Sequence, residues 1–189
     1  MRINEIFASI QGEGHFTGTP SVFIRTSRCN LHCPFCDTLH ETGEEMTVGD
    51  IIRQAVAFEP RHAVVTGGEP ALQPQLPMLV DALHKAGFYV QIETNGTLPL
   101  PDTIDWITCS PKMIDKTVIL APHELKVVYE GQDMQSYERA FRPQVWSLQP
   151  CDTKDAERNR QLISAAVGYI MEHPQWRLSL QTHKLIGVR

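Results

Sequence analysis

Short apolar runs rich in β-branched and aromatic residues recur along the whole chain and alternate with stretches of helical periodicity. Runs of about four to eight such residues, bounded by polar or turn-forming residues, are typical of buried strands. The pattern predicts strands over Ile3–Ile10, Ser21–Thr26, Ala63–Thr66, Tyr89–Glu93, Trp106–Cys109, Glu124–Tyr129, Val145–Gln149 and Trp176–Gln181.

Helical patterns lie between several of these strands. They predict helices over Val48–Phe58, Leu76–Ala86, Met134–Phe141 and Ala156–His173, whereas Met113–Pro122 is too broken to predict one. Thr47 with Asp50 resembles a capping box at the start of the first helix, and Gly87 suits the end of the second. The alternation of strands and helices indicates an α/β fold with a largely parallel sheet.

Polar, often glycine-bearing segments follow five of the predicted strands: Thr66–Pro70, Glu93–Gly96, Ser110–Lys112, Gln149–Pro150 and Gln181–Lys184. Any one of them could be an ordinary polar loop. Because the carboxyl ends of parallel strands meet at one edge, where α/β proteins place their active sites, we expect these segments to share a site.

Length and charge narrow the class of protein. A chain of 189 residues suits one domain spanning residues 1–189. No apolar run approaches the ~20 residues that cross a bilayer, and the N-terminus lacks a signal-peptide pattern, so we expect a cytoplasmic protein with no membrane partner. The net charge of −5 argues against a direct nucleic-acid surface and favours small ligands.

Three of the five cysteines, Cys29, Cys33 and Cys36, form a C-x3-C-x2-C cluster. Disulfides are disfavoured in a cytosolic chain, and three soft thiolates favour an Fe–S cluster or zinc. Three cysteines for four irons would leave one iron open to a ligand. The alternative is a non-enzymatic Cys3His zinc module completed by His32 or His40. Cys109 and Cys151 are expected to be buried thiols.

This cysteine pattern, with the aromatic Phe35 before its last member, resembles the signature of the radical S-adenosylmethionine (SAM) superfamily. Gly67-Gly68-Glu69-Pro70 resembles the superfamily motif that contacts the methionine end of SAM. The resemblance implies a partial, open (β/α)6-type TIM-like barrel that holds a [4Fe–4S] cluster on Cys29, Cys33 and Cys36 and binds SAM. It also leaves a second alternative, a glycyl-radical activase that acts on a partner protein.

A narrower resemblance rests on the run from Ile3 to Gly14, which ends in QGEG, and on Gly18–Ser21, Phe23–Arg25, Cys36–Thr38, Glu93–Gly96, Ser110–Lys112 and Leu180–Lys184. These segments are similar to the 7-carboxy-7-deazaguanine synthases, carbon–nitrogen lyases of queuosine and 7-deazapurine biosynthesis, a pathway of tRNA modification. The resemblance implies that 6-carboxy-5,6,7,8-tetrahydropterin is converted to 7-carboxy-7-deazaguanine with loss of ammonia. It further implies Mg2+, a flavodoxin- or ferredoxin-type reductant and a homodimer.

The same resemblance implies roles for individual residues, although it identifies no side chain as certainly catalytic. Thr38 would bind Mg2+. Apart from the resemblance, we expect the terminal Val188-Arg189 to fold back over the pocket. SAM would contact Phe35, Cys36, Asp37, Gly68, Glu69, Ser110, Pro111 and Lys112. The substrate would contact Ile10, Gln11, Gly12, Glu13, Arg25, Thr66, Gln149 and His183.

Overall fold

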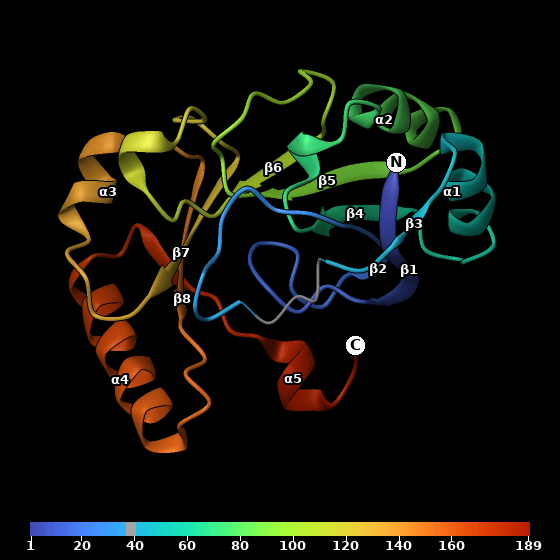
Figure 1. Cartoon of the computed structure of the whole chain (residues 1–189). Helices are drawn as coiled ribbons and strands as arrows, with labels where there is room; N and C mark the ends of the chain where they lie inside the picture. Colours follow the sequence, from blue (N-terminus) through green and yellow to red (C-terminus); the bar gives the residue numbers. More distant parts are fainter. Residues whose placement is uncertain (37–40) are drawn as a thin grey trace.

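A single open sheet organises the chain, whose computed structural model describes residues 1–36 and 41–189 (Figure 1). Nine strands pair in the order β3-β1-β2-β4-β5-β6-β7-β8-β9. Their bounds are β1 Arg2–Ile10, β2 Pro20–Thr26, β3 Glu44–Glu45, β4 His62–Gly67, β5 Tyr89–Thr94, β6 Trp106–Cys109, β7 Glu124–Tyr129, β8 Val145–Pro150 and β9 Trp176–Leu178.

All neighbouring strands from β2 to β9 are parallel, whereas β1 pairs antiparallel with both β2 and β3. Because β3 and β9 are the ends of the sheet within the described residues, the barrel stays open. The predicted partial (β/α)6-type barrel is confirmed, with an antiparallel extension at one edge.

Five α-helices are found in the part of the chain that the structure describes: α1 Val48–Ala55, α2 Leu76–Lys85, α3 Gln135–Ala140, α4 Ala156–Glu172 and α5 Thr182–Ile186. Asp50 N donates to Thr47 Oγ1 at 3.1 Å, so Thr47 caps the start of α1 as predicted. Gly87 has φ +82° directly after α2, a left-handed conformation that favours glycine. Between β6 and β7 the chain contains only a 3-10 turn, η2 Ile114–Lys116, in agreement with the absence of a predicted helix there.

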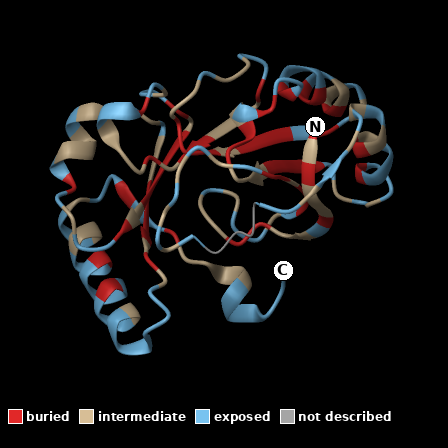
Figure 2. Cartoon of the chain, in the orientation of Figure 1, coloured by how far each residue is buried: buried red, intermediate tan, exposed pale blue. Residues whose placement is uncertain are grey.

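The core of the described residues forms two large apolar clusters, one beneath α1 and α2 and one beneath α3 and α4, and a small third cluster of Phe7, Phe23 and Val64 (Figure 2). Helices α1 and α2 bury Ile51, Leu79 and Leu83 against strands β2, β4 and β5. On the other side, Leu162 of α4 packs with Leu148 of β8 and the fully buried Phe141. Helices on the outer face of the sheet leave the opposite face for binding.

The short edge strand β3 was not predicted, and the end of the chain also differs from the sequence prediction. The last strand ends at Leu178 and not at Gln181, and it is followed by the unpredicted helix α5. Ser179 explains the difference, since its hydroxyl donates to Gln149 Oε1 at 2.8 Å and accepts from Gly14 N at 2.9 Å. These bonds turn the chain across the sheet. None of the helices in the described ranges has the length and apolar character needed to cross a membrane.

Candidate active site

Two adjoining cavities open inside the barrel. The larger, of about 540 Å³, is lined by β1, β2, the loop after β1, and residues of α5 and the C-terminal tail. The smaller, of about 250 Å³, is lined by the three clustered cysteines and by the loops after β4, β5, β6 and β8, and is called the cysteine cavity below. Glu13, Thr66, Glu93 and Lys126 line both, so the cavities meet at these four residues. The predicted convergence of the post-strand loops is therefore observed.

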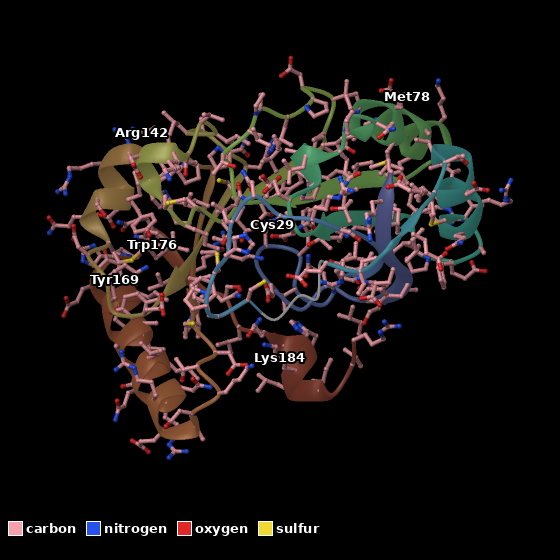
Figure 3. All side chains as sticks on the ribbon, in the orientation of Figure 1. Cys29, Met78, Arg142, Tyr169, Trp176 and Lys184 are labelled. Atoms are coloured by element: carbon pink, nitrogen blue, oxygen red, sulfur yellow. The ribbon has the colours of Figure 1, made fainter. Side chains whose placement is uncertain are left out.

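The cysteine loop follows β2 and packs on the glycine-rich turn after β4 (Figure 3, where Cys29 is labelled). Arg28 opens the loop with φ +72°, and its carbonyl accepts from Glu69 N at 2.8 Å. A Cβ on Gly68 would lie 1.8 Å from Arg28 O, so only glycine permits this approach. The two motifs therefore form one unit, with Cys29, Cys33 and Cys36 on the wall of the same cavity.

None of the three thiols is in a disulfide. Soft thiolates favour an iron–sulfur cluster or zinc, and three of them would leave one iron of a [4Fe–4S] cluster without a protein ligand. Within residues 1–36 and 41–189, no group of three His, Cys, Asp or Glu side chains is arranged to hold a single metal ion. His32 does not line the cysteine cavity; it lines a neighbouring cavity of about 390 Å³, which Cys33 also lines. His40, the other zinc ligand considered, lies outside the described residues.

Burial raises the pKa of the Cys33 thiol, and the neighbouring Lys112 opposes that rise. Lys112 donates to Ser110 Oγ at 2.5 Å and lies 5.7 Å from the centre of the Phe35 ring. A cation next to the cysteines favours thiolates. The cavity therefore provides electrostatic support for a thiolate-bound cluster and for an anionic ligand group.

The residues predicted to contact SAM separate into four groups. Phe35, Cys36, Gly68, Ser110 and Lys112 line the cysteine cavity, and Pro111 lines the cavity behind the loop. Asp37 and the predicted Mg2+ ligand Thr38 lie outside the described residues. Glu69 lines neither cavity.

Glu69 is fully buried below the glycine turn and braces it. Its carboxylate accepts from Thr94 Oγ1 at 2.8 Å, from Asn95 N at 2.7 Å and from Ala71 N at 3.0 Å. Burial raises its pKa and these hydrogen bonds oppose the rise. The Glu69 side chain therefore ties the loops after β4 and β5 together and does not line the cysteine cavity in this structure.

Seven of the eight predicted substrate residues line the larger cavity: Ile10, Gln11, Gly12, Glu13, Arg25, Thr66 and His183. The eighth, Gln149, lines the cysteine cavity, where its Oε1 accepts from Ser179. The reason for glycine at position 12 is a protein contact, because a Cβ there would lie 2.1 Å from His183 Nδ1. Thr182 N donates to Gly12 O at 2.9 Å, which fixes α5 against the loop.

One end of the larger cavity carries two guanidinium groups. Arg25 Nε donates to Glu5 Oε1 at 2.9 Å, and Arg189 forms an ion pair with the other oxygen of Glu5. Arg189 lies 4.6 Å above the Phe7 ring, and its carbonyl accepts from Ser9 Oγ at 2.6 Å. The expected return of Val188-Arg189 over the pocket is thus observed, and this end is suited to a carboxylate.

A buried ion network fills the junction of the cavities. Lys126, only 5% exposed, donates to Glu13 Oε2 at 2.7 Å and to Glu93 Oε2 at 2.9 Å. Gln181 donates to Glu13 Oε1 at 2.9 Å. The sequence prediction did not assign Glu93, Lys126 or Gln181, although a lysine within the apolar run of β7 is an unusual signal.

The two carboxyls that share Lys126 differ in protonation. Burial raises the pKa of Glu93 to about 7, Lys126 opposes the rise, and Glu13 and Glu124 add to it. Burial also acts to raise the pKa of Glu13, but the charge and hydrogen bond of Lys126 and the amides of Gln181 and Gln149 outweigh it and lower the value to about 2. The pair therefore titrates in two separate steps, with Glu13 ionised first.

Comparisons with known proteins agree with this geometry. The family model described as the Radical SAM superfamily matches residues 23–118, which include the cysteines and the glycine turn. A 7-carboxy-7-deazaguanine synthase from Bacteroides thetaiotaomicron is 52% identical over 188 residues, covering 100% of this chain and 98% of the relative. One from Neisseria meningitidis is 37% identical, covering 99% and 93%.

Solved structures give the same result. The crystal structure of QueE from Escherichia coli superposes with a TM-score of 0.70 at 31% identity, covering 96% of this chain and 94% of that one. SuiB from Streptococcus suis, at 17% identity and a TM-score of 0.58, shares the fold over 84% of this chain and 48% of its own. The sequence resemblance is confirmed, and neither the activase nor the zinc module is favoured. The chain belongs to the radical SAM superfamily and, within it, to the 7-carboxy-7-deazaguanine synthases.

Proposed function

We propose that this chain converts 6-carboxy-5,6,7,8-tetrahydropterin to 7-carboxy-7-deazaguanine and ammonia, as a radical SAM carbon–nitrogen lyase. The observation that carries the proposal is the meeting of a thiol-lined cavity with a cavity that presents arginines at one end and carboxyls at the other. A cofactor in the first cavity and a carboxylated heterocycle in the second would place their reacting atoms at the junction.

Cys29, Cys33 and Cys36 would hold the cluster, and Gly68, Ser110 and Lys112 would contact SAM in the cysteine cavity. When bound, the cluster and SAM supply the radical that removes hydrogen from the substrate. The chain contributes orientation: the rigid contact between Arg28 O and Gly68 holds the cysteine loop at a constant distance from the strand ends. Lys112 adds positive charge beside the thiols.

In the larger cavity, Arg25 would bind the substrate carboxylate through its planar fork, next to Arg189. Ionised Glu13 would accept hydrogen bonds from the amino-pyrimidinone edge. Glu13 already accepts from Lys126 at Oε2 and from Gln181 at Oε1, and the Gln149 amide also bonds to this carboxylate. A carboxylate has about four acceptor sites, so room for a substrate donor remains. The backbone of Ile10, Gln11 and Gly12 would form a wall for the ring, with Thr66 and His183 beside it.

Further parts of the proposal extend beyond the described residues. Thr38 would offer a hydroxyl oxygen to Mg2+, a hard cation that prefers oxygen ligands. A Thr38→Ala variant is expected to keep SAM cleavage and to lose the Mg2+ dependence of product formation. An unchanged Mg2+ response contradicts the role of Thr38.

We also propose that the protein is a cytoplasmic homodimer in which residues 1–189 form one radical SAM domain. Its reductant would be of the flavodoxin or ferredoxin type.

The central test uses anaerobically reconstituted protein with the carboxytetrahydropterin, SAM, Mg2+ and a reductant, and measures deazaguanine product by mass spectrometry. Cys33→Ala is expected to abolish cluster absorbance, SAM cleavage and product. Cys109→Ala is the matched control, because Cys109 is a buried thiol that lines none of the three cavities. If protein with a full cluster forms no product, the assignment as a 7-carboxy-7-deazaguanine synthase is rejected. One zinc per chain and no sulfide would instead support the zinc module.

A further inference from the structure

The junction of the two cavities contains few groups that could exchange a proton. Among the described residues, those that line both cavities are Glu13, Thr66, Glu93 and Lys126. Atoms of the substrate that react with a radical from the cysteine cavity must lie beside these four. A proton transfer to or from the reacting ring therefore falls to one of them or to water.

Loss of ammonia requires such a transfer. One ring carbon loses its C–N bond, and the departing amine takes up a proton. The neighbouring carbon loses a C–H proton, and the electron pair of that bond becomes the double bond of the five-membered ring. No electrons are gained or lost in this step, so it needs a group that can both accept and donate a proton.

Protonation behaviour separates the four candidates. The pKa of Lys126 is raised because the attraction of Glu13, Glu93 and Glu124 outweighs burial, so it keeps its proton. Glu13 has a pKa lowered to about 2 and stays ionised. A hydroxyl such as that of Thr66 is a weak acid and a weak base. Glu93, with a pKa of about 7, can exist in both forms at neutral pH.

The surroundings of Glu93 hold its carboxyl at a defined position. Lys126 on β7 donates to Oε2 at 2.9 Å, and Gln91, on β5 like Glu93 itself, donates to Oε1 at 2.9 Å. The charged groups that act on it are Lys126 and Glu124 from β7 and Glu13 from the loop after β1. Its side chain is 16% exposed, and that exposed part faces the cavities.

We propose that Glu93 transfers the proton in the ammonia-loss step, taking it from the ring carbon and returning it to the departing amine, while Lys126 acts as a positioning residue. This inference rests on the proposed function. The carboxyl begins and ends the step in the same state, so no co-reactant is required. Glu13, held by the same lysine, serves binding and not proton transfer.

The test compares reconstituted wild type, Glu93→Gln and the exposed control Glu172→Gln with substrate deuterated at C6. Glu93→Gln is expected to transfer deuterium into SAM within about threefold of wild type. Product formation should fall about 100- to 1000-fold, with accumulation of a ring-contracted species one ammonia heavier than the product. Glu172→Gln should match wild type in both measurements.

Two further measurements separate proton transfer from binding. The wild-type rate of product formation should depend on pH with an apparent pKa near 7, and this dependence should vanish in Glu93→Gln and return in Glu93→Asp. Fluorescence titration of cluster-free protein with 6-carboxypterin should give Kd values for wild type and Glu93→Gln within about threefold. A parallel loss of deuterium transfer and product, or a tenfold weaker Kd, overturns the proposal and assigns Glu93 to binding. Absence of deuterium transfer in wild type rejects the proposed function itself.

Discussion

At the scale of single residues, Lys126 shows how a charge is tolerated in an apolar strand: two carboxylates accept its hydrogen bonds. Lys126→Met removes the cation and leaves both acids buried, so we expect it to destabilise the fold by about 3–5 kcal/mol at pH 8. Without Lys126, both carboxyls bind protons more tightly in the folded state than in the unfolded state. The loss of unfolding free energy should therefore be smaller at pH 5 than at pH 8. Urea unfolding of cluster-free protein measures both values, with exposed Lys85→Met as control. An equal loss at both pH values contradicts the explanation.

The raised pKa of Glu93 predicts that the stability of the wild type falls as the pH rises, which is the opposite of what a carboxylate in an ordinary ion pair produces. The folded pKa of Glu93, about 7, lies above the ordinary value of 4.5. Its contribution is therefore fully present below pH 4.5 and is lost as the pH rises through 7. Glu93→Gln should flatten the decline in unfolding free energy between pH 5 and pH 8. A decline that is as steep in the variant as in wild type would show that another group causes it.

Arg25 tests the orientation of the substrate. Arg25→Lys keeps the positive charge and removes the planar fork, so Kd for 6-carboxypterin should rise about tenfold, or ~1.4 kcal/mol. Pterin without the carboxylate should bind both forms equally. Fluorescence titration measures the values, and Arg160→Lys on the exposed face of α4 is the control. An equal rise in Kd for both ligands would show that Arg25 does not bind the carboxylate.

The sequence predicted the residues that belong to short motifs. It did not predict those whose roles come from contacts with residues far away along the chain. Cys29 and Gly68 stand in short motifs, and both line the predicted cavity. Glu93 and Lys126 acquire their roles from contact with Glu13, which lies 113 residues from Lys126. Glu69 belongs to a motif, yet its carboxylate points into the protein, because motif membership does not fix side-chain direction.

At the scale of elements, apolar periodicity was sufficient for the central strands. β6 and β7 have the predicted bounds, and α1 begins directly after its cap Thr47. β3 and α5 could not be anticipated. β3 is a two-residue edge strand that pairs with β1, and α5 buries no residue and is held by hydrogen bonds from distant loops. Neither element carries an apolar pattern of its own.

The contact between the cysteine loop and the glycine turn yields an element-scale prediction. Gly68→Ala places a Cβ 1.8 Å from Arg28 O and 2.4 Å from Arg28 C, and because these are backbone atoms the cysteine loop must move away from the glycine turn. We expect the variant to retain less than half of the wild-type iron and sulfide after reconstitution. Gly168→Ala in α4, where the new Cβ meets nothing within 4 Å, should keep full cluster content and gain about 0.5–1 kcal/mol in stability. Full iron content in Gly68→Ala contradicts the proposed rigidity.

At the scale of the whole molecule, the open edge of the barrel is closed over the larger cavity by α5 and the tail. Gln181 reaches Glu13, and Lys184 pairs with Asp152 at 3.0 Å, joining α5 to the loop after β8 (Figure 3). Arg189 completes the opposite side next to Glu5. The strands line the sides of the larger cavity, and α5 and the C-terminal tail cover it.

The bonds between residues 9–14 and residues 179–189 also bear on how the protein is made. During synthesis, strands β1 to β8 emerge from the ribosome before the segment that bonds to Gly12, Glu13 and Ser9. Pairings this distant along the chain form late, because a long loop must first be closed. The nascent chain therefore has most of its core before it has a substrate site. If the chain binds the proposed pterin substrate, we expect that binding to depend on residues 179–189, because these residues complete the larger cavity.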